Sequence, residues 1–495
     1  MSAFRTLGKW ILRATVIVAG LVATIVLAFA VRSRAALPDL QPWHRLVLKE
    51  EYYAGRKDVS TFADYKKLED RLFAELQTRL IDDAQAADSF ALGRYHKGSP
   101  PNRLALETKY NRSFELAQEN PRGAVLLVHG LTDSPYSMRA MAETFHAQGY
   151  YVVALRMPGH GTIPSMLRGV DWKDWYAAVT LAAKYAKSKA GAGHQFVVGG
   201  HSTGAALLTL YSLRATVDST LPKPDQLFLM SPAIGISSAA ALTRIISGLA
   251  FIPYFEKSEW TDILPEYDPY KYNSFPVNAG KQIFLVTREV QAELDDARKA
   301  GRLSAMPRIT VFQSLVDATV KTVDIVTKLL AVVPANGSEL VLFDVDREET
   351  LQGLLASAPI EYLERIRNAH DLPFRMTLIA NRSDTTLGMA EYSRAAGGSE
   401  VTKRDLPLEW PRGVFSLGHV SIPFPVDDPV YGLTPARDPA NVRFELGAFP
   451  ARGESGALRV PLGNMARLRS NPFFGVIREK VAAAVGGVDA NSPTR

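Results

Sequence analysis

The sequence predicts an α/β fold in which a mostly parallel sheet is covered by helices on both faces. Short apolar runs at residues 123–128, 150–155, 195–199 and 226–230 have the composition of strands that are buried on both sides. Longer segments of helical composition separate these runs, and strand–helix alternation of this kind produces parallel strands. The apolar fraction of 47% in a chain of 495 residues is ordinary for a globular protein with a large core.

The most informative motif is Gly200-His201-Ser202-Thr203-Gly204, which lies between the predicted strand 195–199 and an apolar helix that follows it. A G-x-S-x-G sequence at a strand-to-helix junction is typical of a nucleophile elbow, a tight turn that exposes the serine hydroxyl at the edge of the sheet. Glycine is needed on both sides because a Cβ atom there would collide with the neighbouring strand or helix. The motif therefore predicts Ser202 as a nucleophile.

A serine nucleophile also needs a base, a carboxylate that orients the base, and N–H donors for the oxyanion. The elbow supplies one donor, the backbone N–H of Thr203, because this residue follows the nucleophile. The second donor is expected in the turn after the strand 123–128, and we predict the backbone N–H of Leu131. His129, in the same turn, is expected to brace the loop by hydrogen bonding.

Three motifs together carry a family resemblance. They are H-G-L-T-D-S-P at 129–135, R-M-P-G-H-G at 156–161 and G-H-S-T-G at 200–204. In this order they resemble the α/β-hydrolase superfamily, and most of all its carboxylesterase and monoacylglycerol-lipase-like branch. The resemblance covers roughly residues 103–345 and a segment around His419. It implies the α/β-hydrolase fold and a serine hydrolase that cleaves carboxylic esters, lipid esters among the candidates, through an acyl-enzyme and a Ser-His-Asp triad without a cofactor or metal.

The family order of serine, acid and histidine restricts the remaining triad members. His370 and His419 both come late enough in the chain, and we favour His419, which lies in a loop after a glycine. For the acid, Asp317 and Asp384 each follow a predicted strand. We favour Asp317 because a complete strand–helix–strand unit surrounds it, although family members usually place the histidine after the very next strand. Asp384 stays the alternative.

The chain divides into four predicted parts. Residues 1–35 form an N-terminal membrane anchor, 36–102 a helical stalk or brace, 103–430 the hydrolase domain, and 431–495 a loop-rich extension with a final helix. Two stretches interrupt the strand–helix alternation, and we predict a cap insertion at about 233–306 and a second insertion at about 346–418. Eight aromatic residues fall within residues 251–275 of the cap. They are expected to line an acyl-binding pocket, with a small separate core as the alternative reading.

The eighteen residues 14–31 carry no charge and are preceded and followed by basic residues. As a helix they would span about 27 Å, which is just enough to cross a bilayer core. We favour an uncleaved single-pass anchor over a cleaved signal peptide, which is the alternative because Ala28-Phe29-Ala30 resembles a cleavage site. An anchor at this position most often leaves the following domain outside the cytoplasm, which in a bacterium is the periplasmic side.

Composition excludes several other functions. The chain has no cysteine, which rules out disulfides, thiolate metal sites and a cysteine nucleophile. The net charge of +6 is spread along the chain without a dense basic block, so we expect no nucleic-acid partner. No nucleotide, zinc or dinucleotide motif occurs. The alternatives to an esterase are an acyltransferase that uses the same acyl-enzyme and a non-catalytic binding protein with the hydrolase fold.

Overall fold

A computed structural model describes residues 37–83, 90–191, 193–235, 253–317, 319–348, 357–369, 371–437, 444–446 and 466–486, with a few positions between 10 and 31. Within this part of the chain, no helix has both the length and the hydropathy that crossing a bilayer requires. Part of the predicted anchor at residues 14–31 lies outside the described residues.

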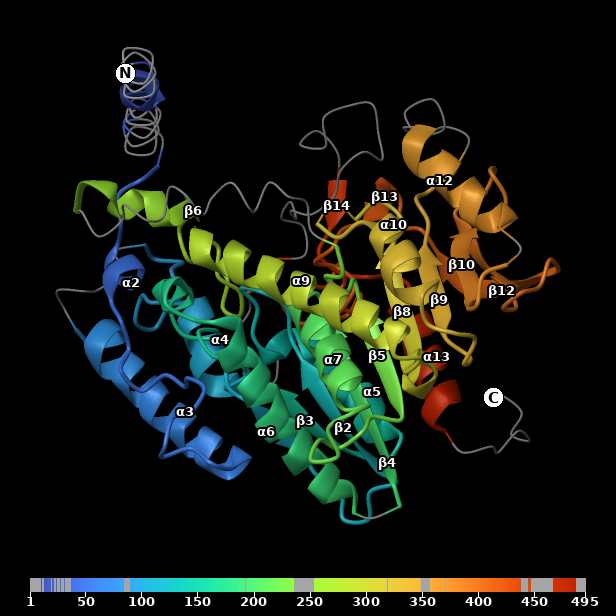
Figure 1. Ribbon diagram of the computed structural model, residues 1–495, viewed down its shortest axis with the longest axis horizontal. Helices are drawn as coiled ribbons and strands as arrows, with labels where there is room; N and C mark the ends of the chain where they lie inside the picture. Colours follow the sequence, from blue (N-terminus) through green and yellow to red (C-terminus); the bar gives the residue numbers. More distant parts are fainter. Residues whose placement is uncertain are drawn as a thin grey trace, which may run out of the picture.

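A single ten-stranded sheet forms the centre of the molecule, in the order β1-β3-β2-β4-β5-β8-β9-β10-β11-β12 (Figure 1). The seven strands from β3 to β10 in this order are parallel, and β1, β11 and β12 add antiparallel edges. The predicted mostly parallel sheet is therefore present. The parallel strands are β2 (Gly123–Val128), β3 (Tyr150–Leu155), β4 (Gln195–His201), β5 (Gln226–Met230), β8 (Arg308–Ser314), β9 (Glu339–Phe343) and β10 (Arg375–Asn381).

Helices cover both faces of the sheet. Residues of β2 alternate between two hydrophobic cores: Leu126 faces the core that includes α6 (Trp172–Ala190) and α7 (Thr203–Arg214), whereas Leu127 faces the core of α5 (Arg139–Ala147) and α13 (Phe474–Val485). Strand geometry causes this alternation because successive side chains point to opposite faces. The final helix that the sequence predicts is thus α13, and it completes the second core.

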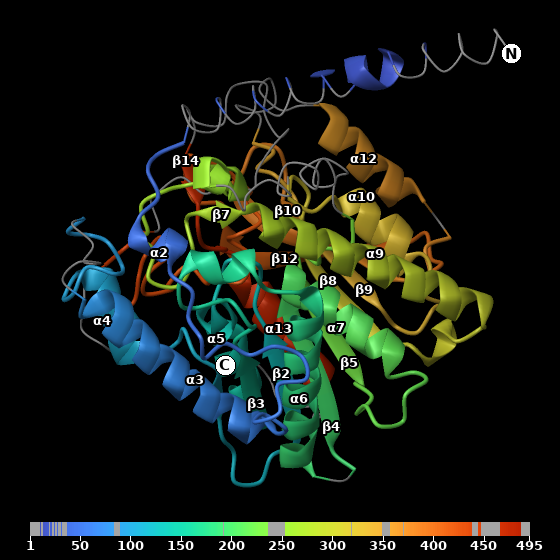
Figure 2. The ribbon, with the colours of Figure 1, turned by 60° about the vertical axis from the view of Figure 1, so that its left-hand side comes forward.

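The segment 36–102, predicted as a stalk or brace, lies against the hydrolase body. Its main helix is α3 (Phe62–Leu76), which begins with a capping box between Thr61 and Asp64 and packs beside α6 (Figure 2). The other short elements before β2 are α2 (Pro42–Arg45) and η1 (Gln77–Ile81) within this segment, α4 (Pro100–Thr108) at its end, and β1 (Phe114–Leu116) after it.

A buried ion cluster connects this segment to the loop after β3. The Arg156 guanidinium is fully buried and lies 2.9 Å from the Glu51 carboxylate and 2.8 Å from the Glu69 carboxylate of α3. Arg156 is the first residue of the R-M-P-G-H-G motif, so these ion pairs join the motif to the N-terminal segment. Burial raises the pKa of Glu69, and the Arg156 charge opposes this effect. Each charge in the cluster is tolerated in the interior only because the others compensate it.

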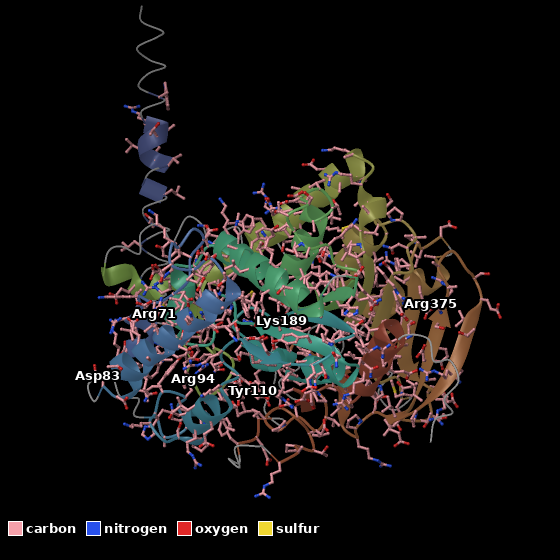
Figure 3. All side chains as sticks on the ribbon, turned by 90° about the horizontal axis from the view of Figure 1, so that it is seen from below. Arg71, Asp83, Arg94, Tyr110, Lys189 and Arg375 are labelled. Atoms are coloured by element: carbon pink, nitrogen blue, oxygen red, sulfur yellow. The ribbon has the colours of Figure 1, made fainter. Side chains whose placement is uncertain are left out.

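Arg156→Met is therefore expected to destabilise the protein by about 3–5 kcal/mol, because it leaves the buried Glu69 and the mostly buried Glu51 without their cation. The matched control is Arg71→Met, on the exposed face of α3 (Figure 3), where Arg71 pairs with the partly exposed Glu50 and Asp58. An exposed pair of this kind contributes about 1 kcal/mol or less. Urea unfolding of both variants measures the difference, and equal losses would contradict the assignment of Arg156 as the structural link.

The predicted cap contains η5 (Pro253–Glu259), β6 (Trp260–Asp262), β7 (Phe275–Pro276), α9 (Val277–Lys299) and η6 (Leu303–Ala305). The long helix α9 packs on α7, the helix that follows the elbow (Figure 1). Residues 236–252 of the cap lie outside the described residues.

The segment 346–418, expected as a second insertion, continues the main sheet. β10 pairs in parallel with β9, and β11 (Gly388–Arg394) and β12 (Val401–Glu409) extend the edge as antiparallel strands. Beyond them, β13 (Val414–Leu417) pairs with β14 (Ala466–Leu468) in a small separate sheet. The helices α10 (Thr322–Ile325), η7 (Val326–Leu330) and α12 (Ser357–Asn368) connect the last parallel strands.

Candidate active site

The elbow around Ser202 has the strained geometry that the motif predicts. Ser202 lies between β4 and α7 with a φ of 51°, a conformation that residues with side chains rarely adopt. The turn is held by its own backbone, because the Ser202 N–H donates to Met230 O at 2.9 Å and Ser202 O accepts from Ala233 N at 3.2 Å. These bonds fix the side chain at the carboxyl end of β4.

The two glycines of the elbow permit close backbone contacts. A Cβ atom on Gly200 would lie 2.7 Å from Ala205 N, and one on Gly204 would overlap the carbonyl oxygen of Val128. The space around the turn is therefore filled by backbone, which cannot move aside as a flexible side chain could. This is the physical reason for the glycines at both positions.

His419 and Asp317 lie together although 102 residues separate them. The His419 Nδ1–H donates to Asp317 Oδ2 at 2.7 Å, and both side chains are buried. The other carboxylate oxygen, Oδ1, accepts from the backbone N–H groups of Thr319 and Val320 at 2.8 and 2.9 Å. Asp317 is thus held by the loop after β8, and its bond fixes the histidine as the tautomer with a free Nε2 lone pair.

The loop of His419 is attached to the sheet independently of this pair. Ser314, at the end of β8, donates a hydrogen bond to Leu417 O at 2.8 Å.

The alternative acid, Asp384, lies exposed in the turn between β10 and β11. The structure therefore brings Asp317, and not the alternative acid Asp384, to His419. The alternative histidine, His370, lies outside the described residues.

Ser202 and His419 line one cavity of about 380 Å³. The predicted oxyanion donors belong to it as well: Leu131 lies on the loop after β2, and Thr203 is the first residue of α7, where the N–H groups have no partner within the helix. Its apolar wall includes Phe275 and Ile283 of the cap and Val320 of the acid loop. The cavity combines the serine of the elbow, an oriented imidazole and an apolar surface.

His129 braces the oxyanion loop as expected. Its Nδ1–H donates to Gly130 O at 2.8 Å, and its Nε2 accepts from Met157 N at 3.0 Å. Burial lowers the pKa of His129 to about 4, so the ring stays neutral and keeps this pair of bonds. Because both nitrogens are occupied, His129 has no lone pair available for a serine proton.

A charged pair beneath the oxyanion loop was not foreseen from the sequence. Asp133 of the H-G-L-T-D-S-P motif lies 3.0 Å from the Lys271 ammonium of the cap, and its other oxygen lies 3.5 Å from His201 Nδ1. Burial opposes the ionisation of Asp133, but Lys271 and His201 hold its pKa below the usual range. His201 Nε2 in turn donates to His419 O at 3.2 Å. In the sequence, the position of Asp133 within the motif could have indicated this pair, whereas nothing distinguishes Lys271 from other lysines.

The cap aromatics divide among several roles. Among the cap aromatics whose side chains the structure describes, Phe275 lines the cavity of Ser202, whereas Tyr267 and Tyr272 line an adjoining one. Trp260 packs with Leu40 and the His44 ring of the N-terminal segment, so it belongs to a small separate core. Both readings of the aromatic cluster thus apply to different residues. Within the described residues, no group of three or more His, Asp or Glu side chains is arranged to hold a metal ion.

Comparison with known proteins agrees with this architecture. Residues 119–329 match the serine aminopeptidase S33 family. The chain is also 31% identical over 180 residues to a thermostable monoacylglycerol lipase of Bacillus sp. (strain H-257), an alignment that covers 36% of this chain and 67% of the relative. The chain belongs to the S33-type α/β-hydrolases. It is a serine hydrolase, similar to lipases and esterases, as the sequence predicts.

One similar solved structure comes from work on LipS and LipT, two metagenome-derived lipolytic enzymes. It is 20% identical, with a TM-score of 0.37, and the alignment covers 52% of this chain and 98% of that chain. Another is the monoacylglycerol lipase of Paleococcus ferrophilus, at 16% identity and a TM-score of 0.36, covering 47% and 88%. Likenesses this distant carry no conclusion, and the family assignment depends on the sequence matches.

Proposed function

We propose that this hydrolase cleaves carboxylic esters, including those of lipid acyl chains, with Ser202, His419 and Asp317 as its catalytic triad. The observation that carries the proposal is the 2.7 Å hydrogen bond from His419 to Asp317 beside the cavity that contains the elbow serine. The monoacylglycerol lipase of Bacillus sp. supports a lipid ester as the substrate.

The geometry gives each group a step. His419 Nε2 takes the proton of Ser202 as its oxygen attacks the ester carbonyl, and Asp317 stabilises the imidazolium that forms. The backbone N–H groups of Leu131 and Thr203 stabilise the negative charge on the former carbonyl oxygen. His419 then gives the proton to the leaving alcohol, and water releases the acid from the acyl-enzyme by the same sequence of steps. An acyltransferase would differ only in that an alcohol or amine replaces this water.

The experiment combines a fluorophosphonate probe with a chain-length series of p-nitrophenyl esters. The wild-type protein should be labelled and should hydrolyse the esters, since both reactions need an activated serine. A folded protein that reacts with neither would favour the alternative of a non-catalytic binding protein. If an added alcohol receives most of the acyl group as a new ester, and little free acid forms, the result would favour the acyltransferase.

Phe275 is proposed to contact the acyl chain, because it is the cap aromatic on the wall of the Ser202 cavity. Phe275→Ala should raise KM for butyrate and hexanoate esters by about 10-fold or more while changing acetate less, since a lost apolar contact costs about 1–3 kcal/mol. Trp260→Ala is the matched control, because Trp260 is buried elsewhere in the cap. Equal changes for acetate and hexanoate in Phe275→Ala would contradict the acyl-pocket role.

We also propose that residues 14–31 anchor the enzyme in a membrane, with the catalytic domain on the periplasmic side. The support is the uncharged run of eighteen residues with basic flanks. Full-length protein should stay in the membrane fraction during alkaline carbonate extraction and keep its N-terminus, as mass spectrometry would detect. A mature chain that begins near residue 31 would instead establish the signal-peptide alternative.

A further inference from the structure

The turn that carries the predicted oxyanion donor Leu131 has a strained backbone. It belongs to the oxyanion loop, residues 129–133, and it is closed by the N–H of Asp133, which donates to Gly130 O at 3.3 Å. Leu131 and Thr132 are its two central residues. Thr132 has a φ of 63°, which is rare for a residue with a branched Cβ. Such a conformation persists only where the surrounding structure holds it, so the contacts that hold Thr132 also fix its neighbour Leu131.

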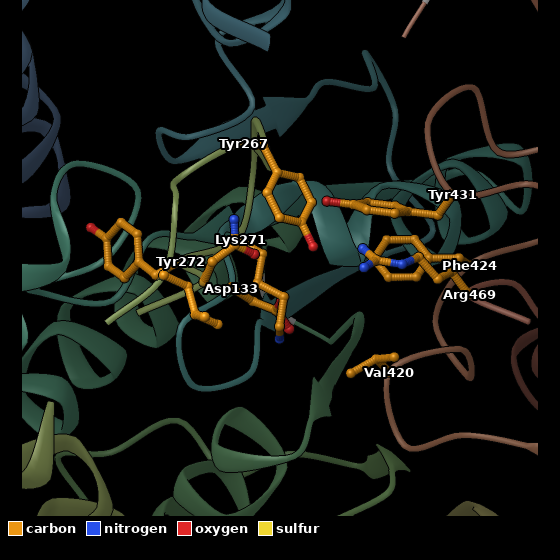
Figure 4. Close-up of a pocket in the computed structure, with 10 residues that line it drawn as sticks. Asp133, Tyr267, Lys271, Tyr272, Val420, Phe424, Tyr431 and Arg469 are labelled. Atoms are coloured by element: carbon orange, nitrogen blue, oxygen red, sulfur yellow. The ribbon is translucent and has the colours of Figure 1, made fainter. Parts of the chain in front are cut away.

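Two contacts from the cap hold this turn. The backbone N–H of Tyr272 donates to Thr132 O at 2.8 Å, and the Lys271 ammonium donates to Asp133 Oδ1 at 3.0 Å. Figure 4 shows Lys271 and Tyr272 beside Asp133. The Asp133 side chain is 7% exposed, so loss of the ammonium would leave a buried charge with little compensation from water. Two consecutive residues of the cap thus contact two consecutive residues of the oxyanion loop.

The cap segment around Tyr272 is itself held by hydrogen bonds. The carboxylates of Asp268 and Glu266 accept from the backbone N–H groups on its two sides, those of Tyr270, Lys271, Asn273 and Ser274. The buried Tyr272 hydroxyl accepts from Thr162 N at 2.7 Å and donates to Gly159 O at 3.1 Å, both in the loop after β3. The segment is therefore fixed on the hydrolase body, with the N–H of Tyr272 directed at the oxyanion loop.

The oxyanion loop also packs closely against the elbow. A Cβ atom on Gly130 would lie 2.9 Å from His201 Nδ1, 3.0 Å from Asp133 Oδ2 and 3.3 Å from the Cβ of Ser202. No free space therefore separates the loop from these side chains. A displacement of Asp133 would shift the loop against Ser202, and with it the distance from the Leu131 N–H to an oxyanion formed on the serine.

We propose that Lys271 is a positioning residue, which acts through Asp133 to hold the oxyanion loop at the distance from Ser202 that catalysis requires. This inference rests on the proposed esterase function and makes the oxyanion hole dependent on the cap. Lys271 takes part in no chemical step. The Leu131 N–H, which it positions, stabilises the negative charge that develops on the carbonyl oxygen. Because this charge is absent from the bound substrate, a misplaced donor should change kcat more than KM.

The first test compares Lys271→Met with the wild-type protein on p-nitrophenyl butyrate, with active sites counted by fluorophosphonate titration. The variant should lower kcat by about 10- to 100-fold and change KM by less than about threefold, since complete removal of one oxyanion donor costs about 10²–10³-fold. Lys271→Arg keeps the positive charge and should restore kcat to within about threefold. Lys271 also lines the cavity of Ser202, so a raised KM with wild-type kcat would make it a substrate contact and overturn the inference.

Lys257→Met is the matched control. Lys257 is also a partly buried lysine of the cap, but it lies in η5 and pairs with Asp39 of the N-terminal segment instead of the oxyanion loop. The control should keep the wild-type kcat and KM. An equal loss of kcat in Lys257→Met and Lys271→Met would show a general effect of cap ion pairs and would overturn the specific role of Lys271.

The second test measures inhibition by butyl trifluoromethyl ketone and by butyl methyl ketone. The serine adds to the fluorinated ketone and forms an oxyanion that resembles the transition state, whereas the methyl ketone reports binding of the ground state. Lys271→Met should weaken the fluorinated ketone by about the factor by which kcat/KM falls, and the methyl ketone by less than about twofold. Equal weakening of both ketones would overturn the inference, because inhibition constants do not depend on the fraction of folded protein.

Two further outcomes separate this inference from the proposed function. A wild-type protein that neither hydrolyses the ester nor binds the fluorinated ketone would overturn both, whereas wild-type kcat in Lys271→Met would overturn the inference alone. If thermal unfolding shows that Lys271→Met does not fold, the double variant Asp133→Asn/Lys271→Met replaces it, because it leaves no buried carboxylate without its cation. The double variant should also lose kcat by about 10- to 100-fold. A folded double variant with wild-type kcat would overturn the inference.

Discussion

Ser202→Ala is expected to abolish fluorophosphonate labelling and to lower kcat for p-nitrophenyl butyrate by about 10⁶-fold, because it removes the hydroxyl oxygen that we propose attacks the ester. The protein should stay folded, since alanine fits wherever the serine Cβ already lies and the elbow is held by backbone bonds to Met230 and Ala233. The positive φ at position 202 should strain the backbone about equally in both proteins, because alanine and serine both carry a Cβ atom.

The matched control for this experiment is Ser188→Ala, on the exposed side of α6. It should keep both labelling and turnover. Persistent labelling of Ser202→Ala would show that another residue is the nucleophile, and the elbow would then serve only as a structural turn.

Asp317→Asn is expected to lower kcat by about 10⁴-fold with little change in thermal stability. Asparagine keeps the shape, and its oxygen can still accept from Thr319 and Val320, but its amide cannot accept the Nδ1 proton of His419. The imidazole then takes the wrong tautomer and loses the charge that stabilises the imidazolium. Stopped-flow measurement of the acylation step would detect the loss directly.

Asp384→Asn serves as the control, because Asp384 lies in an exposed hairpin turn and should tolerate the change. His419→Ala should be about as inactive as Asp317→Asn, and the double variant scarcely worse, because triad residues act as a unit. If Asp384→Asn were inactive and Asp317→Asn kept normal turnover, the proposed triad would be contradicted.

The sequence by itself determined the first parallel strands of the sheet and the elbow. Strands buried on both faces must be continuously apolar, and the four runs from 123 to 230 are all strands of the sheet. The elbow was recognisable because its glycines are a steric requirement of the turn, as the backbone contacts of Gly200 and Gly204 demonstrate. Such local constraints can be recognised from a single sequence, because the residues that impose them are neighbours in the chain.

Only the tertiary structure shows which of the two acids lies beside His419. Asp317 and Asp384 both follow strands, and the sequence favoured one only through the pattern around it. The choice depends on where the loop of His419 returns to the sheet, and this is fixed by distant contacts such as the bond from Ser314 to Leu417. The segment 346–418 also had to be seen as part of the sheet, because the pairing of β10 with β9 is a long-range contact.

The tertiary structure likewise revealed the charged groups that no motif marks. Arg156 joins α3 to the loop after β3, and Lys271 of the cap reaches Asp133 beneath the oxyanion loop. Arg469 reaches the same region from the end of the chain. A lone lysine or arginine in a sequence resembles any solvated surface residue, because its role depends on a partner that is close in space and far away along the chain. Burial and pairing, which only the folded chain defines, distinguish these residues from solvated ones.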